Sequence, residues 1–260
     1  MLRTRIWSAL VMAPPALAAI WVGGYAFALL AAAAAAVMCW EWHGMVSGGF
    51  PPAGRVAAAL CAAAALAVPA APPLAVILVV VAALASAALA PPVEGKRPRL
   101  WVGLGALYAG LPSVALVWLR QNDGLALVVW LFALVWATDI GAYAAGRLIG
   151  GPLLLPSVSP RKTWAGLLGG MGAAAAVGGG IGLLFPPAES LPVGLLAVVS
   201  GALAVVAQAG ELLESWVKRR WGVKDSSAII PGHGGLLDRV DGLLAVALVA
   251  AGVALAGHPW

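Results

Sequence analysis

Apolar segments long enough to cross a lipid bilayer recur along the whole chain, and most charged residues fall between them. The 260 residues are 63% hydrophobic and only 10% charged, with a mean hydropathy of +0.99. A water-soluble domain of this length needs more charge to cover its surface. Because an open sheet edge cannot satisfy its backbone groups in lipid, spanning segments of this kind must be helices. The sequence therefore predicts an all-α integral membrane protein, a polytopic helical bundle.

Proline, glycine and charged residues divide the apolar sequence into candidate spans, each near the roughly 20 residues that a bilayer core requires. These spans are 6–22, 24–40, 56–71, 73–90, 100–119, 124–148, 163–185, 191–214 and 242–257. They predict about nine transmembrane helices. The basic residues Arg3 and Arg5 before the first apolar run leave a cleaved signal peptide as an alternative to a retained first span.

Lysine and arginine indicate which side of the membrane each loop faces, because short cytoplasmic loops are rich in them. With nine spans and a cytoplasmic N-terminus, all but Arg120 of the 15 basic residues fall on the cytoplasmic side. These residues are Arg3, Arg5, Arg55, Lys96, Arg97, Arg99, Arg147, Arg161, Lys162, Lys218, Arg219, Arg220, Lys224 and Arg239. We expect a protein integral to the cytoplasmic membrane. Its net charge of +5 suits anionic lipid headgroups, and nothing in the sequence suggests nucleic-acid binding.

Small residues recur at every fourth position of the candidate span 163–185. They are Gly166, Gly170, Ala174, Gly178 and Gly182. On a helix they would line one face and allow a neighbouring helix to approach closely. Chance recurrence is the alternative, because the chain contains 33 glycines.

A first polar cluster lies within the candidate span 124–148, where Asp139 and Tyr143 are one helical turn apart. Asp139 is about nine residues, or roughly 14 Å, from the inner end of that span. A carboxylate at that depth costs several kcal/mol unless it is paired, hydrated or bound to a cation. We favour a functional role over a purely structural partner for a basic residue.

A second polar cluster, Ser159, Arg161, Lys162 and Thr163, directly precedes the candidate span 163–185. Thr163 is a candidate N-cap, and free N–H groups at a helix start bind anions, helped here by two neighbouring cations. The cluster can seat a phosphate group. Ordinary charges flanking a membrane span are the equal alternative.

The third cluster begins at the end of the span 191–214 with Glu211 and Glu214, and continues through the predicted cytoplasmic signature loop 215–242. Its glycines permit tight turns and close approach to a ligand, and its carboxylates are hard oxygen ligands suited to Mg²⁺. The basic residues would balance a polyphosphate. The residues concerned are Ser215, Lys218, Arg219, Lys224, Asp225, His233, Gly234, Gly235, Asp238, Arg239 and Asp241. His233 is as suited to shaping the loop as to acting chemically.

In this segment the chain resembles the phosphatidate cytidylyltransferases, also called CDP-diacylglycerol synthases. The resemblance is carried by Ser215-Trp-Val-Lys-Arg219, Lys224-Asp225, His233-Gly-Gly235 and Asp238-Arg-Val-Asp241, and extends to the stretches 139–147 and 159–164. Two positions depart from the family's usual pattern: Ala165 replaces a common glutamate, and Glu211 replaces an aspartate.

The resemblance implies an enzyme that joins CTP to phosphatidate, with Mg²⁺ as cofactor and a second cation left open. It implies catalytic roles for Lys224 and Arg239, and catalytic and metal-binding roles for Asp225, Asp238 and Asp241. It implies substrate binding by Ser215, Lys218, Arg219, His233, Gly234, Gly235, Ser159, Arg161, Lys162, Thr163, Asp139 and Tyr143. The expected site faces the cytoplasm. We expect N-terminal transmembrane helices over 1–120 and a catalytic transmembrane region over 121–260; a homodimer is left open.

Two other classes of function fit parts of the sequence. A related CTP-dependent enzyme, such as a polyprenol kinase or an archaeol cytidylyltransferase, would act on another lipid acceptor. A secondary transporter could use Asp139, Glu211 and Glu214 as an ion relay. A transporter needs polar residues toward both faces, whereas the predicted outer side is nearly bare.

Overall fold

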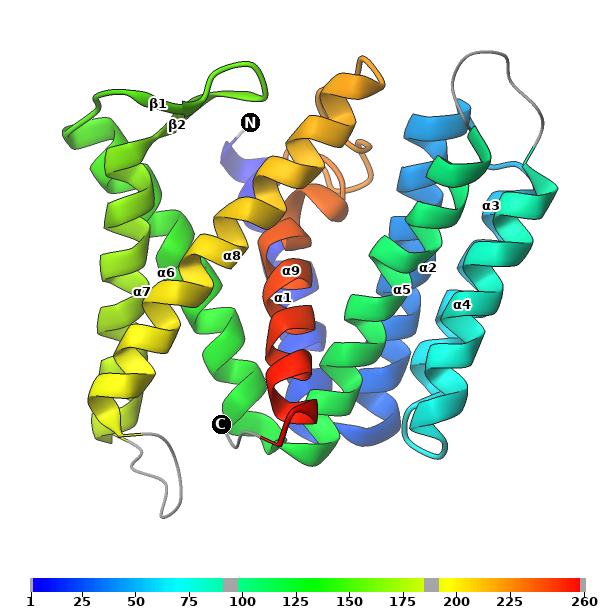
Figure 1. Ribbon diagram of the computed structural model, residues 1–260, viewed down its shortest axis with the longest axis horizontal. Helices are drawn as coiled ribbons and strands as arrows, with labels where there is room; N and C mark the ends of the chain where they lie inside the picture. Colours follow the sequence, from blue (N-terminus) through cyan, green and yellow to red (C-terminus); the bar gives the residue numbers. More distant parts are fainter. Residues whose placement is uncertain (1, 91–97, 185–191, 258–260) are drawn as a thin grey trace. The chain divides into compact units, whose positions relative to one another are not determined.

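The computed structural model describes residues 2–90, 98–184 and 192–257, and Lys96 and Arg97 of the predicted cytoplasmic set lie outside these ranges. The described residues form nine α-helices and one two-stranded sheet (Figure 1). The chain divides into two compact units. Unit 1 is Met1–Leu125 with Arg220–Val240, and unit 2 is Ala126–Arg219 with Asp241–Trp260. The C-terminal loop before the last helix thus belongs to the same unit as the N-terminal helices.

Unit 1 is built mainly from five of the described helices. They are α1 (Leu2–Val22), α2 (Gly24–Ser47), α3 (Pro52–Ala67), α4 (Pro72–Leu89) and α5 (Pro98–Asn122). Alanine is prominent on the buried faces of α2, α3 and α4. Helices α2 to α5 contact one another, and Figure 1 shows them side by side. Proline begins α3 and α4, where its missing N–H costs no hydrogen bond.

Arg120, the basic residue predicted to lie alone on the outer side, joins α5 to the end of α1. Its Nε donates to the carbonyl oxygen of Ile20 and its Nη2 to that of Trp21, each at 2.8 Å. The guanidinium group thereby caps carbonyls that the last turn of α1 leaves unpaired. Gly23 follows with φ +71°, and an added Cβ there would lie 2.9 Å from the Arg120 Cζ.

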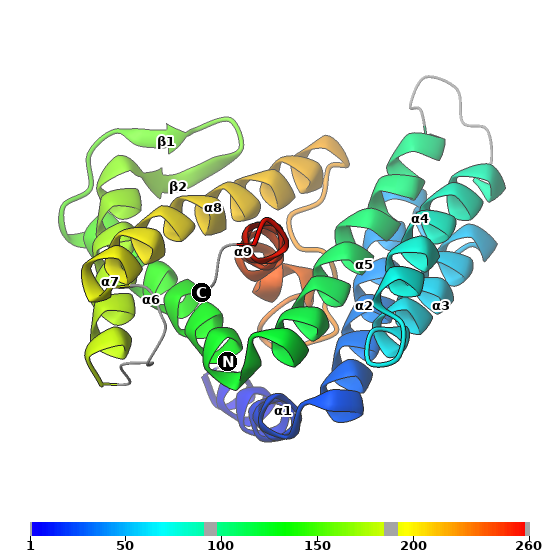
Figure 2. The same ribbon diagram turned by 60° about the horizontal axis from the view of Figure 1, so that its bottom comes forward.

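Unit 2 contains most of the remaining regular structure (Figure 2). Its elements are α6 (Gly124–Leu148), the antiparallel strands β1 (Leu153–Leu155) and β2 (Ser159–Thr163), α7 (Trp164–Leu184), α8 (Val193–Arg220) and α9 (Leu237–Leu255). The first residues of α6 and α9 and the last residue of α8 belong to unit 1. The strands lie in the sequence between α6 and α7, for which the sequence analysis predicted no strand.

The predicted stripe of small residues on α7 is its buried face. Gly166, Gly170, Ala174, Gly178 and Gly182 are the buried residues of that helix. An added Cβ would lie 3.0 Å from the Ala142 carbonyl oxygen at Gly166, and would overlap the Ser200 side chain at Gly178. The stripe therefore packs α7 closely against α6 at one end and against α8 at the other, which confirms close packing over chance.

The helical, membrane-compatible class predicted from the sequence is confirmed. Within the described residues, six helices are long and apolar enough to cross a membrane: α2, α4, α5 from Arg99, α6, α7 and α8. Three described helices differ. The apolar stretch of α1 is Leu10–Val22, α3 has 16 residues, and α9 carries Asp238, Arg239 and Asp241 near its start. The count of nine transmembrane helices therefore stays a prediction.

Candidate functional site

The loop 221–236 precedes α9, and aromatic residues attach its beginning to unit 1. The Trp221 ring meets Trp101 of α5 edge-on, with ring centroids 6.2 Å apart, and the Arg220 Cζ lies 5.2 Å from the Trp101 ring centroid. Trp101 stacks on Trp42 of α2, whose Nε1 donates to the Trp101 carbonyl oxygen at 2.8 Å. Cation–π and edge-to-face contacts therefore hold the chain where it leaves α8.

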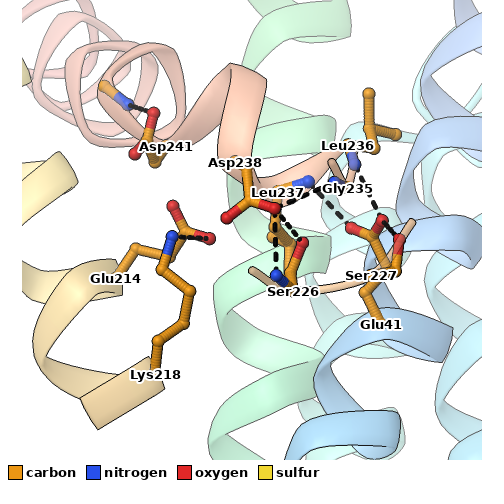
Figure 3. Close-up of polar contacts among 11 residues, drawn as sticks. Glu41, Glu214, Lys218, Ser226, Ser227, Gly235, Leu236, Leu237, Asp238 and Asp241 are labelled. Atoms are coloured by element: carbon orange, nitrogen blue, oxygen red, sulfur yellow. Dashed lines mark hydrogen bonds and ion pairs between the residues drawn. The ribbon is translucent and has the colours of Figure 1, made fainter. Parts of the chain in front are cut away.

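The end of the loop is held by Glu41 of α2 (Figure 3). Its Oε1 accepts hydrogen bonds from the Ser227 hydroxyl and the Leu236 N–H, both at 2.7 Å. Its Oε2 accepts one from the Leu237 N–H at 2.8 Å. Leu237 is the first residue of α9, so a buried carboxylate from another helix satisfies N–H groups at this helix start.

Asp238 holds the loop from the other side (Figure 3). Its Oδ2 accepts hydrogen bonds from the N–H and hydroxyl of Ser226, each at 2.9 Å, and from the Gly235 N–H at 2.8 Å. A carboxylate that accepts several such bonds fixes the backbone around it. Asp238 therefore fixes the conformation of the loop. The sequence predicted Asp238 as a metal ligand and did not predict this structural role.

Gly234 lies between Asp225 and Asp238. It adopts φ +87°, and an added Cβ would lie 3.0 Å from the Asp238 Oδ2 and 3.9 Å from the Asp225 Cβ. A left-handed residue without a side chain lets these carboxylates approach the same stretch of backbone. Asp225 and the neighbouring Lys224 are exposed, as a substrate-binding role requires.

The assignment of Asp225, Asp238 and Asp241 as metal ligands stays a prediction. Among the described residues, no group of three or more His, Cys, Asp or Glu side chains is arranged to hold a metal ion. Asp241 lies one turn beyond Asp238 on α9, and its Oδ1 accepts a hydrogen bond from the Gly242 N–H at 2.9 Å. Since Mg²⁺ commonly uses one or two carboxylates together with substrate phosphates, the donor set of Asp225 and Asp238 fits this ion.

His233 contacts the first helix of the chain. The Ser8 hydroxyl oxygen lies 3.0 Å from the His233 Nδ1 and donates to the Pro231 carbonyl oxygen at 3.2 Å. The histidine ring is thus held against α1. This contact supports a loop-shaping role, one of the two that the sequence left open.

A second polar group forms within unit 2 around Lys162 of β2. The Lys162 ammonium is paired with the carboxylate of Glu211 on α8, and it donates to the Gln208 Oε1 at 2.8 Å. Glu211 also interacts electrostatically with Asp139 and Asp241. Residues of β2 and α8 therefore contact one another here, and the carboxylates of Asp139 and Asp241 repel that of Glu211 electrostatically.

Thr163 directly precedes α7 and caps its start, as the sequence predicted. Its Oγ1 accepts a hydrogen bond from the Gly166 N–H at 3.0 Å, the geometry of an N-cap. Thr163 is buried, whereas Arg161 is exposed and Ser159 is half-buried. The cap is confirmed, and the phosphate seat stays a prediction.

The other predicted substrate-binding residues have varied surroundings. Lys218 is buried and pairs with Glu214 on the same helix, Nζ to Oε1 at 3.3 Å (Figure 3). The Tyr143 hydroxyl accepts a hydrogen bond from the Arg147 Nη1 at 3.2 Å. Ser215 is half-buried and Arg219 is exposed, and so is Arg239, for which a catalytic role was predicted.

Sequence reasoning missed Glu41 and Gln208. Glu41 is the sole acidic residue among the first 93, and it sits beside the end of a predicted apolar span. An isolated carboxylate in such a place signals a specific partner. Gln208 gave no comparable signal, because burying a neutral amide in an apolar helix costs less free energy than burying a carboxylate.

Comparison with known proteins gives one consistent result. The sequence profile of the cytidylyltransferase family matches residues 3–255. A phosphatidate cytidylyltransferase from Brucella suis biovar 1 (strain 1330) is 41% identical over 249 residues, which are 95% of this chain and 90% of the relative. One from Staphylococcus haemolyticus (strain JCSC1435) is 41% identical over 146 residues, 56% of this chain and 52% of the relative.

Proposed function

This chain belongs to the cytidylyltransferase family, and on that premise we propose that it transfers CMP from CTP to phosphatidate. The products are CDP-diacylglycerol and pyrophosphate. The observation that carries the proposal is the 41% identity to a phosphatidate cytidylyltransferase over 95% of the chain. The protein is thus a nucleotidyltransferase of phospholipid biosynthesis.

The reaction places two phosphate-bearing substrates together. A phosphate oxygen of phosphatidate attacks the α-phosphorus of CTP and forms a new P–O bond. The bond from that phosphorus to the bridging oxygen breaks, and pyrophosphate leaves with the electron pair. Because the lipid phosphate is already an anion, no strong general base is needed. The protein must instead align the phosphates and offset their repulsion.

The loop 221–236 and the start of α9 supply groups for this task. Asp225 and Asp238 would hold Mg²⁺, which neutralises charge on the CTP phosphates and on departing pyrophosphate. Lys224 and Arg239 adjoin these two aspartates in the sequence, and both side chains are exposed. They would bind phosphate oxygens. Within unit 2, Lys162, Glu211, Asp139 and Asp241 belong to a second charged group, and we infer that the Lys162 ammonium binds a substrate phosphate.

The chain is a membrane protein, and we place its reaction at the cytoplasmic face. Nine spans with a cytoplasmic N-terminus leave Arg120 as the one outer basic residue, and its guanidinium is occupied as a helix cap. An Ala228→Cys variant tests this orientation, because Ala228 is exposed and the native Cys39 and Cys61 are buried. We expect an impermeant thiol reagent to label the Ala228→Cys variant in inverted vesicles, where the cytoplasmic side faces outward. The same reagent should not label the variant in intact cells.

The activity test uses the purified protein in detergent with Mg²⁺, radiolabelled CTP and phosphatidate. We expect label in CDP-diacylglycerol and release of pyrophosphate. Turnover only with a polyprenol or an archaeol-derived acceptor would replace phosphatidate with that substrate. Family membership sets aside the transporter considered from the sequence. The homodimer stays a prediction, which sedimentation of the detergent-solubilised protein addresses.

A further inference from the structure

We propose that Glu41 is a positioning residue, which holds the loop 221–236 and the start of α9 where Asp225 and Asp238 can act. The expected effect of Glu41 on turnover rests on the function proposed above. The claim that Glu41 fixes the position of the loop rests only on its hydrogen bonds. Glu41 lies 186 residues before its nearest partner in sequence, on helix α2, to which the proposed reaction assigns no residue.

Glu41 is a buried carboxylate, so it requires hydrogen-bond donors around it. It is 1% exposed, although α2 is otherwise a strongly apolar helix. A buried carboxylate is costly unless donors surround it. Its three donors all come from the loop and the start of α9: the Ser227 hydroxyl and the N–H groups of Leu236 and Leu237. Within the described residues, Glu41 therefore serves this segment and nothing else.

Glu41 and Asp238 share consecutive donors of the loop. Ser226 and Gly235 donate to Asp238, while the residues that follow each of them, Ser227 and Leu236, donate to Glu41. Figure 3 shows the two carboxylates on either side of this backbone. In each pair, Ser226-Ser227 and Gly235-Leu236, one residue donates to Asp238 and the next donates to Glu41. A shift of the Asp238 carboxylate would therefore also move the backbone that Glu41 binds.

Gly235 lets this arrangement close. It is buried, and an added Cβ would lie 2.5 Å from the Glu41 Oε1 and would overlap the Ser226 hydroxyl. Any side chain here would push Glu41 away from the backbone. The sequence Gly234-Gly235 therefore has two separate uses: the first residue turns the chain, and the second admits the carboxylate of α2.

The main test is Glu41→Gln, with His43→Gln as the matched control. The variant keeps the size of Glu41, but its amide would present N–H groups to N–H donors of the loop. His43 lies two residues away on the same helix, is equally buried, and its Nδ1 lies 2.7 Å from the Cys39 carbonyl oxygen of its own helix. Both variants perturb α2, and only the first touches the loop.

Hydrogen exchange of the full-length protein in detergent reads the hold on the loop without any assay of turnover. In Glu41→Gln we expect the amides of Leu236 and Leu237 to exchange about 10- to 100-fold faster, as loss of charge-assisted hydrogen bonds predicts. In His43→Gln they should exchange as in the wild type. Unchanged exchange in Glu41→Gln, or equal acceleration in both variants, would overturn the proposal.

Kinetics then test the consequence for the reaction. We expect kcat of Glu41→Gln to fall about 10²-fold, since small displacements of catalytic groups cost that much, and its Mg²⁺ requirement to rise. The control should retain both. Lack of CMP transfer by the wild-type protein would refute the proposed function, and the exchange experiment would still decide the role of Glu41.

Ser227→Ala gives a milder variant in case Glu41→Gln does not fold. It removes one of the three donors, and we expect a few-fold acceleration of exchange at Leu236. Added to Glu41→Gln, it should have little further effect, because the shared hydrogen bond is already lost. Fully additive effects, or no effect of Ser227→Ala alone, would show that Glu41 does not hold the loop.

Discussion

The loop 221–236 of unit 1 and the α6–α7 pair of unit 2 position polar residues by different physical means. In the loop, the carboxylates of Glu41 and Asp238 accept hydrogen bonds from backbone and serine groups. Between α6 and α7, glycines bring the helices close: an added Cβ at Gly170 would lie 3.0 Å from the Thr138 carbonyl oxygen. One region depends on charge and donor direction, and the other on the absence of side-chain volume.

This difference predicts which substitutions each region tolerates. A change of one atom type, such as carboxylate to amide, should disturb the loop while leaving its volume intact. A single added methyl group should disturb the helix pair while leaving its charges intact. The two kinds of variant therefore separate losses of chemistry from losses of packing.

The largest expected effect comes from Asp225→Asn and Asp238→Asn, and Asp241→Asn tests whether this third aspartate also binds the ion. Each removes a charge suited to a hard cation, and we expect turnover to fall by orders of magnitude, as a lost metal ligand predicts. Asp225→Asn should fold normally because Asp225 is exposed, whereas Asp238→Asn should also lower thermal stability because its Oδ2 accepts three bonds. Turnover against Mg²⁺ concentration, with thermal denaturation, measures both.

Asp123→Asn is the control for these variants. Asp123 lies between α5 and α6, and burial raises the pKa of its carboxyl above the ordinary value. A raised pKa means that the folded state binds its proton more tightly, so stability falls as pH rises from the ordinary value through the raised one. The amide should flatten that part of the pH profile and leave turnover intact. Near-normal turnover of all three site variants would refute the metal assignment.

A smaller effect is expected at Lys162, where unit 2 also relies on charge. We expect Lys162→Met to lower kcat/KM for CTP about 10- to 100-fold. The reason is that the Lys162 ammonium, besides pairing with Glu211, is proposed to bind a CTP phosphate. Glu211→Gln should be milder, because it spares the cation. Steady-state kinetics of both variants and of the double variant test this. Restoration of activity in the double variant would show that Lys162 only neutralises Glu211.

The smallest effect separates packing from chemistry on one helix. At Gly169, an added Cβ would overlap that of Ala145 and lie 2.9 Å from the Gly141 carbonyl oxygen, whereas at Gly172 no described atom lies within 4 Å. We expect Gly169→Ala to cost about 1–3 kcal/mol of stability through overpacking. Gly172→Ala should be neutral or stabilising, since alanine favours helix. Thermal denaturation measures both, and equal stability would contradict tight α6–α7 packing.

Much of the fold could be predicted because the bilayer limits the choices. Apolar length and the need to satisfy backbone groups in lipid dictate helices, and the nine described helices overlap the predicted spans. The small-residue period of α7 and the Thr163 cap were also readable, because both depend on spacing within one helix. The assignment of catalytic function to 121–260 stays a prediction, and the loop 221–236 packs with the N-terminal helices.

By itself the sequence determined which residues bear charge in an apolar chain, and hence where chemistry gathers. The tertiary structure alone decided their partners. Glu41 meets Ser227 and Lys162 meets Glu211 across intervals of 186 and 49 residues. Such pairings leave no periodic pattern, because they depend on how separate helices pack rather than on spacing within one helix. Local sequence fixes which face of a helix is polar, whereas the packing of distant segments selects the group that each polar atom contacts.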